Sequence, residues 1–370
     1  MIGRRAVQFL GATLAFGAAA TIVALGSAAD TSAADVGASR AAVRVLVYHD
    51  MEGLAGQDDW RTYLFSHPEK YPEGQKMLAA DLNAVIEGLY AGGATQVDVV
   101  DAHGSGNPEP DVRRDLLDQR AKQVIRDRAF DPYVDITAPN VYDAVVAVGM
   151  HAKTGSKGFA SHTITLGMDV LMNGKSITES EIVGYSWGGV GVPVIFVSGD
   201  DRLREDLRVM PWIEFVVTKK ATSASTVELR PVDSVHAEMR DKAARAVRQI
   251  SRAKPMKIAT PIRAALRAVP PASLASLKDI PGITYADQTV TFTAPTFRAA
   301  YDGVIALVGA ARPAYSTVLT ETVRKLPDGT KVMADYSDAL FTRWMDYESG
   351  RWQPPPTPTG PRGKTFHGDR

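Results

Sequence analysis

The sequence predicts an α/β protein in which a three-layer core, a mainly parallel sheet between helices, is joined by a smaller C-terminal α+β region. Apolar, β-branched runs of strand length recur through the N-terminal half of the chain. A segment with helical periodicity separates the first two runs, and strand–helix–strand order implies a parallel pair. The chain has 370 residues, of which 45% are hydrophobic, so it can bury a large core.

The first predicted strand is the run VRVLVYH at residues 43–49, which leads into the tetrapeptide DMEG. Side chains alternate between the two faces of a strand, so Asp50 and Glu52 are expected on one face and His49 on the other. Two buried carboxylates that converge are costly unless a positive group lies between them. A metal ion is such a group, and the alternative is a pair of loop acids that cap the next element.

The chain then continues through a helix and a second strand. Apolar residues recur with the 3.6-residue period at 74–89, and Gly92-Gly93 ends that helix. The run QVDVVD at 96–101 is the second strand, and His103 follows it. Residues 115–125 are predicted to form another helix.

A third buried strand, AVVAVGM at 144–150, ends in His151. Residues 162–171 are predicted to be extended, with a hairpin turn at Asn173-Gly174, whereas the pattern at 180–186 is ambiguous. The elements expected after them are a strand at 192–198, a helix capped by Asp200 that runs to Val209, and a short strand at 213–218.

Residues 43–230 are therefore predicted to be an α/β metal-binding catalytic domain, and 231–311 the smaller α+β region. The latter holds a long amphipathic helix at 232–250, a proline-rich stretch, a strand-like run and a helix at 296–308.

Residues 312–370 are predicted to be a tail whose composition is that of disorder from about residue 353. The tail is predicted to contain one amphipathic helix at 338–347. One face of this helix would carry Leu340, Phe341 and Trp344.

The N-terminus has the three-part pattern of a bacterial secretory signal, which we place at residues 1–29. Arg4 and Arg5 precede an apolar run, and small residues follow it. Residues 30–42 are predicted to be a flexible mature N-terminus. We therefore expect export to the periplasm or medium, by a route that the sequence leaves open. The alternative is a retained membrane anchor, but the low Leu and Ile content favours cleavage, which would leave no stable membrane span.

Charge and cysteine content narrow the function classes. Lys and Arg number 42 and balance 42 Asp and Glu, so the formal net charge is zero and nothing indicates a nucleic-acid partner. The sequence has no cysteine, which excludes disulfides, zinc–thiolate sites and cysteine nucleophiles. Any metal must be held by His, Asp and Glu.

Candidate metal ligands follow three of the predicted strands: Asp50 and Glu52, then His103, then His151. In a parallel sheet these strand ends share one edge, where α/β folds bind ligands. A lone histidine there is more often a polar terminus than a ligand. As a set, nitrogen and oxygen donors suit zinc, with manganese or cobalt as alternatives. They exceed the three ligands of a usual catalytic metal, so a two-metal cluster with a bridging carboxylate fits better.

Several short motifs carry a resemblance to a known family. In chain order they are DMEG at 50–53, DAH at 101–103, GMHA at 149–152, SH at 161–162, a Glu, and VPVIFVSGDD at 192–201. In this order and spacing they resemble the zinc-dependent D-aminopeptidase family, from about Arg44 to about Ala311. The set is specific, although no single motif is. The signal segment and the tail have no counterpart in the resemblance.

The resemblance implies a role for each matched residue. Asp50 would bridge two zinc ions, with Glu52, His103 and His151 as further ligands. His162 would be the catalytic histidine.

The family's last ligand is a glutamate that follows a glycine. Counted back from Tyr185 without gaps, Glu179 takes this place, but Thr178 stands where the family has glycine. Glu181 is a nearby rival, and the two glutamates share a face if the segment is extended.

We therefore predict an exported zinc-dependent aminopeptidase with two zinc ions per chain, which removes N-terminal residues, D-amino acids such as D-Ala, from short peptides. His162 would act as acid, base or nucleophile. The alternatives are a metal-dependent amidase or esterase on other small substrates, and a non-catalytic peptide- or metal-binding protein of the same fold. The resemblance also implies a homo-oligomer.

The remaining histidines are predicted to be structural rather than functional. They are His49, His67, His236 and His367. Asn107, in the loop after His103, is assigned a turn role, with substrate contact as the alternative.

Overall fold

The structure is a computed structural model that describes residues 42–103, 109–126, 128, 133–270, 272–311 and 316–354. The predicted signal segment, nearly all of the predicted flexible N-terminus, Asn107, and the end of the tail with His367 lie outside the described residues. Within the described ranges, none of the helices has the length and hydropathy needed to cross a bilayer.

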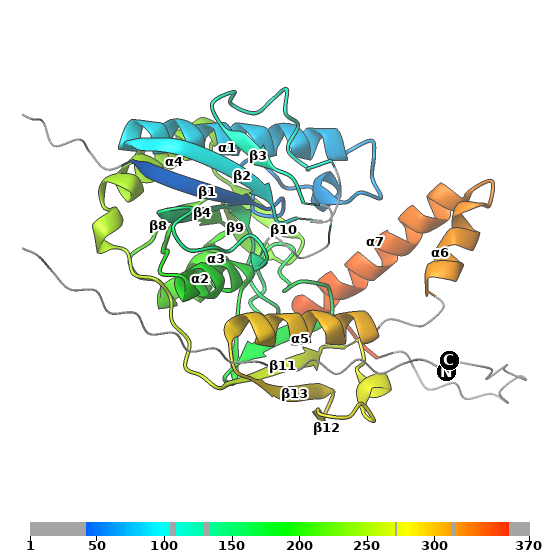
Figure 1. The fold of residues 1–370 in the computed structure, drawn as a ribbon. Helices are drawn as coiled ribbons and strands as arrows, with labels where there is room; N and C mark the ends of the chain where they lie inside the picture. The colour runs from blue at the N-terminus through cyan, green and yellow to red at the C-terminus, as the bar shows by residue number, and fades with distance from the viewer. Residues whose placement is uncertain are drawn as a thin grey trace, which may run out of the picture. The chain divides into compact units, whose positions relative to one another are not determined.

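The main sheet has six parallel strands in the order β3-β2-β1-β4-β7-β8 (Figure 1). This confirms the predicted fold class. The chain builds β2 and β3 on one side of β1 and then β4, β7 and β8 on the other, so the strand order reverses between β1 and β4. Such a reversal is where open α/β sheets bind ligands. The strands are β1 (Val43–His49), β2 (Ala94–Asp101), β3 (Lys122–Val124), β4 (Ala144–Met150), β7 (Val194–Gly199) and β8 (Glu214–Val217).

Helices cover both faces of this sheet (Figure 1). Val45 and Val47 of β1 pack in the cluster with α1 (Tyr71–Gly92) and α4 (Val232–Arg248). Leu46 and Tyr48 belong to the opposite cluster, which includes side chains of α2 (Glu179–Gly189) and Leu203 of α3 (Asp201–Asp206). Burial on both faces explains why β1 is a continuous apolar run.

A second, antiparallel sheet has the order β12-β13-β11-β5-β6, and α5 (Phe297–Ala310) packs on β11. These strands are β5 (Met168–Met172), β6 (Lys175–Ser176), β11 (Ile262–Ala268), β12 (Thr284–Ala286) and β13 (Thr289–Ala294). The smaller α+β region is thus present. Its sheet also includes β5 and β6, which precede residue 230 in the sequence. In contrast, α4 follows residue 230 but packs on α1, beside the main sheet. The predicted domain boundary stays a prediction. A hairpin of β9 (Lys219–Ser223) and β10 (Thr226–Leu229) completes the strands described.

Two predicted elements are wrong. Residues 115–125 form turns that lead into β3 rather than a helix. Asn83 bonds the carbonyl of Leu116 and the amide of Asp118, whose side chain accepts from the Arg120 amide at 2.9 Å, and such side-chain–backbone bonds compete with a helix. The extended stretch from 162 begins as a strand only at Met168, because Ile164 takes a left-handed φ of 69°. The ambiguous residues 180–186 lie in α2.

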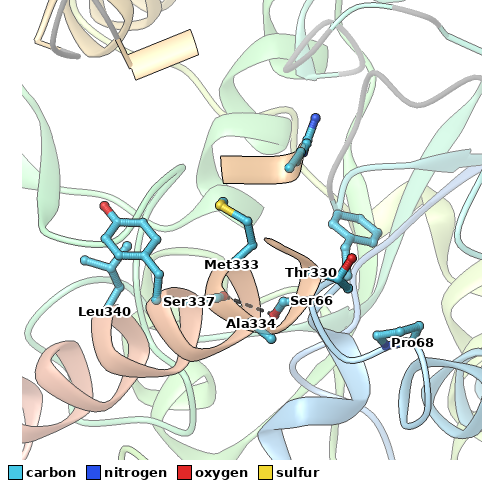
Figure 2. A pocket seen from close by; sticks show the side chains of 10 residues that line it. Ser66, Pro68, Thr330, Met333, Ala334, Ser337 and Leu340 are labelled. Atoms are coloured by element: carbon cyan, nitrogen blue, oxygen red, sulfur yellow. Dashed lines mark hydrogen bonds between the residues drawn. The ribbon is translucent and has the colours of Figure 1, made fainter. Parts of the chain in front are cut away.

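The described part of the tail forms a helical hairpin of α6 (Ser316–Arg324) and α7 (Gly329–Glu348) (Figure 1). The predicted helix is therefore present but longer. Phe341 and Trp344 are buried, whereas Leu340 is 41% exposed. Ser66 donates to the Ser337 hydroxyl at 3.1 Å (Figure 2). This bond lies beside a hollow of about 540 Å³ that is lined by the loop around Ser66 and by residues of α6 and α7.

Candidate metal centre

The predicted ligand residues converge at the carboxyl edge of the main sheet. Asp50 and Glu52 follow β1, His103 follows β2, His151 follows β4, and Glu179 opens α2. All are buried except His103, whose side chain is 10% exposed. The reversal of strand order between β1 and β4 places Asp50 beside His151.

Among the described residues, side chains that could hold a metal form three overlapping groups: two that contain Asp50, and a third of Glu52, His151 and His162. His151 Nε2 lies 3.4 Å from Asp50 Oδ2 and 3.6 Å from Glu179 Oε1. His103 Nε2 lies 3.8 Å from Glu52 Oε1. Asp50, His151 and Glu179 can place one ligand atom each within 4.8 Å of one another, and so can Asp50, Glu52 and His103. Asp50 belongs to both groups.

The electrostatics of the cluster fit a bound cation. Burial, and then the neighbouring Asp50, raise the pKa of Glu52 well above its usual range. Burial also raises the pKa of Glu179. Asp50 Oδ2 and His151 Nε2 are buried, and within the described part of the chain neither makes a hydrogen bond. Unpaired polar atoms inside a protein are costly, and a metal ion between them would satisfy both.

Two glycines allow the turn after β1 to lie against the end of β4. A Cβ at Gly53 would lie 2.0 Å from the carbonyl oxygen of Met150. A Cβ at Gly149, whose φ is +73°, would lie 2.3 Å from the carbonyl oxygen of Asp50. Any larger residue would push these strand ends apart, and with them Asp50 and His151.

A buried lysine, Lys219, also supports the turn after β1. Lys219 Nζ donates to the carbonyl oxygen of Glu52 at 2.7 Å and to Gln57 Oε1 at 2.7 Å. Burial lowers the pKa of Lys219 to about 7. The side chain therefore fixes the backbone of Glu52 whether or not it is charged.

Further hydrogen bonds orient the imidazoles. His151 Nδ1 donates to the carbonyl oxygen of Ala152 at 2.9 Å, which leaves Nε2 facing the cluster. His103 Nδ1 pairs with the carboxylate of Asp111, which also accepts from the Tyr71 hydroxyl. The Asp111 amide in turn donates to Asp101 at 2.8 Å. Carboxylate partners of this kind fix the ring of a metal-ligating histidine and raise its basicity.

Glu179 and Glu181 have different surroundings, because the segment is the first turn of α2 and not extended. Glu179 Oε1 accepts from the Ile164 amide at 2.7 Å, and Oε2 accepts from the Tyr133 hydroxyl at 2.5 Å. Glu181 faces away and forms a capping box with Thr178, whose amide it binds at 2.8 Å. Positions two apart on a helix point in different directions, so only Glu179 reaches the cluster.

His162 lies over the cluster with its ring stacked on that of His151, the centroids 4.2 Å apart. Its Nδ1 donates to the carbonyl oxygen of Ala160 at 2.8 Å, so a neutral ring carries its lone pair on Nε2. Burial, and then the charge of His151, lower the pKa of His162 to about 3. The side chain is therefore a free base near neutral pH.

Comparison with known proteins identifies the fold and family. The D-aminopeptidase family, peptidase family M55, has a sequence model that matches residues 43–305. The chain belongs to the D-aminopeptidase family. It is accordingly an enzyme of the metallopeptidase class.

A curated sequence and a solved structure from Bacillus subtilis are similar to this D-aminopeptidase-family chain. A curated D-aminopeptidase of strain 168 is 25% identical over 210 residues, which are 56% of this chain and 74% of that protein. The solved structure of the Zn-dependent D-aminopeptidase DppA, a self-compartmentalizing protease, matches with a TM-score of 0.67 and 23% identity. The match covers 74% of this chain and 99% of DppA, and it establishes the shared fold.

The three other described histidines of this family member belong to none of the candidate ligand groups. His67 bonds Glu69 at 3.0 Å and Asp338 at 2.6 Å, and His236 of α4 bonds Asp81 of α1 at 2.7 Å. His49 is fully buried, and its Nδ1 lies 3.9 Å from Asp101 Oδ1.

Several residues that support the site carry no signal in the sequence. Asp111, Tyr133 and Lys219 support the predicted ligands, and none stands in a motif that marks it. Glu348 lies 187 residues beyond Ser161 in the sequence, and the tertiary fold brings it to the loop that carries His162.

Proposed function

We propose that this chain is a zinc-dependent aminopeptidase that binds two zinc ions and removes N-terminal D-amino acids, such as D-Ala, from short peptides. The observation that carries this proposal is the pair of ligand groups that share Asp50. His151 and Glu179 would complete one zinc position, and Glu52 and His103 the other. The name of DppA, a Zn-dependent D-aminopeptidase, supports the choice of metal and substrate.

Each part of the site has a chemical task in this proposal. Zinc, when bound, polarises the scissile carbonyl and lowers the pKa of water. His162 accepts a proton at Nε2 and returns it to the leaving amine nitrogen, as general base and then acid. Asp111 holds His103, and the carbonyl of Ala152 holds His151, so that the ligands keep their positions as charge develops.

The experiment that tests the proposal compares short peptides that differ in one property each. We expect the purified protein to hydrolyse D-Ala-D-Ala and longer peptides with N-terminal D-Ala, and to lose this activity in a chelator and regain it with zinc. Peptides with N-terminal L-Ala, and D-peptides with an acetylated amine, are the controls.

Other outcomes would replace the proposal. Cleavage of the acetylated peptides or of simple esters instead would assign the amidase or esterase alternative. Binding of D-peptides without turnover by the zinc-loaded protein would assign the non-catalytic one.

We also propose that the protein is exported and forms a homo-oligomer. The three-part pattern at residues 1–29 supports export. The description of DppA as a self-compartmentalizing protease supports assembly.

A further inference from the structure

We propose that α7 braces the loop that carries His162, and that Glu348, the last residue of α7, is the positioning residue through which the helix acts. The inference rests on the catalytic role proposed for His162. The match to the family model ends at residue 305, so α7 lies beyond the part of the chain that the model describes.

Glu348 is a buried carboxylate whose hydrogen bonds go to the loop at residues 155–161. It is 3% exposed. Oε1 accepts from the Gly155 amide at 2.8 Å, and Oε2 accepts from the Lys157 amide at 3.3 Å and from the Ser161 hydroxyl at 3.0 Å. A single side chain thus holds three points of the loop. Burying a carboxylate lowers the stability of the fold unless its oxygens accept hydrogen bonds. The three bonds therefore fix the position of Glu348 and also the positions of the loop residues that donate them.

A second residue of α7 holds the same point of the loop. Trp344 Nε1 donates to the carbonyl oxygen of Ser161 at 2.9 Å. Ser161 is therefore held by α7 at both its hydroxyl and its carbonyl, directly before His162 in the chain. The two bonds leave little freedom for the backbone that sets the direction of the imidazole.

The backbone of this loop needs such support. Lys157, Ala160 and Ile164 have φ angles of 59°, 54° and 69°, in the left-handed region that residues other than glycine rarely adopt. Conformations of this kind persist only where the surroundings hold them. The carbonyl of Ala160 accepts from His162 Nδ1, so a relaxed Ala160 would release both the direction and the tautomer of the ring.

The other part of α7 is anchored near the opposite side of the site. Phe341 packs on Trp60 and Tyr63, with ring centroids 4.5 Å and 5.7 Å away, and Tyr63 in turn lies edge-on to His103 at 5.9 Å. Ser66 also donates a hydrogen bond to Ser337, four residues before Phe341 on α7 (Figure 2). Because it is fixed here, α7 can hold the loop at Glu348 rather than move with it.

We therefore expect Glu348, which lies outside the site, to affect turnover but not metal binding. A misplacement of about 1 Å in a catalytic group can lower the rate about 10²-fold. Glu348 contacts none of the proposed ligands, so zinc content is expected to be unchanged. The residues that would hold the metals keep their positions, so the loss is expected in kcat and not in KM.

The test compares Glu348→Ala and Glu348→Gln with Asp346→Asn, a control on the same helix whose side chain bonds the exposed Arg351. We expect Glu348→Ala to lower kcat by a factor on the order of 10–100, with KM and zinc content unchanged. Glu348→Gln keeps one acceptor oxygen and is expected to restore part of the loss. Asp346→Asn should behave as the parent protein.

Amide hydrogen exchange of the metal-free proteins provides a readout that does not depend on activity. We expect faster exchange at residues 155–162 in Glu348→Ala, with unchanged exchange in β1 and β4. If the parent protein fails to cleave D-peptides, faster exchange in Glu348→Ala would still support the brace, and the failure would count against the proposed function alone.

Normal kcat together with normal exchange at residues 155–162 would overturn the inference. Loss of zinc from a folded Glu348→Ala protein would also overturn it, because Glu348 would then act on the metal centre. If Glu348→Ala does not fold, Trp344→Phe removes one hydrogen bond to Ser161 and keeps the packing. Unchanged kcat and exchange in that variant would be equally contradictory.

Discussion

Replacing His162 by alanine is expected to lower turnover by a factor on the order of 10²–10⁴, the usual scale for losing a general acid or base. Zinc content and melting temperature should stay at the parent values. The reason is the position of the side chain, which stacks on His151 but holds its own Nδ1 proton on the carbonyl of Ala160. With a pKa lowered to about 3 by burial, the ring is neutral near pH 7 and carries its lone pair on Nε2.

Steady-state kinetics and elemental analysis of the same preparation check this expectation. His236→Ala is the matched control, since this histidine bonds Asp81 between α4 and α1 and lies outside the cluster. Metal loss in His162→Ala would make His162 a ligand, which its proximity to Glu52 and His151 allows. Near-normal turnover would remove the catalytic assignment and leave the mechanism to the metals.

The second large effect is expected at Glu179. Glu179→Gln should lose zinc from the position it shares with Asp50 and His151, and activity with it, because an amide replaces a charged ligand oxygen. Glu181→Gln should keep its zinc and most of its activity. Gln can also complete a capping box with Thr178, so the start of α2 is expected to be kept and the free energy of unfolding to change little.

Elemental analysis and thermal melting of the two variants separate the roles. Equal loss of zinc in both would contradict the placement of Glu179, and so would metal loss in Glu181→Gln alone. The comparison is matched, since both residues lie in the first turn of one helix and undergo the same chemical change.

Much of the centre could be predicted from the sequence because its ligands follow strands. β1, β2 and β4 are buried apolar runs, and a parallel sheet brings the residues after them, Asp50, His103 and His151, to one edge. Glu179 was placed by counting within the family pattern. The sequence pattern at 180–186 is ambiguous, and the structure places Glu179 in the first turn of α2, which Thr178 and Glu181 cap.

The supporting residues could not be predicted because no local pattern marks them. Asp111 bonds His103 from a segment without regular secondary structure. The neighbouring residues 115–125 have a helix-like pattern but form turns and β3. Glu348 and Ser161 are 187 residues apart in the sequence, and both sheets are formed by the residues before α7. Contacts of such long sequence separation depend on tertiary packing, which periodicity does not record.

The most direct test of the account is the zinc content of the protein. Elemental analysis of protein purified without chelator and resupplied with zinc is expected to find two zinc ions per chain, because Asp50 joins two separate ligand groups. Substituting Asp50 by alanine should remove both. One zinc ion or none in the fully resupplied protein would contradict the two-metal centre on which the proposed function depends.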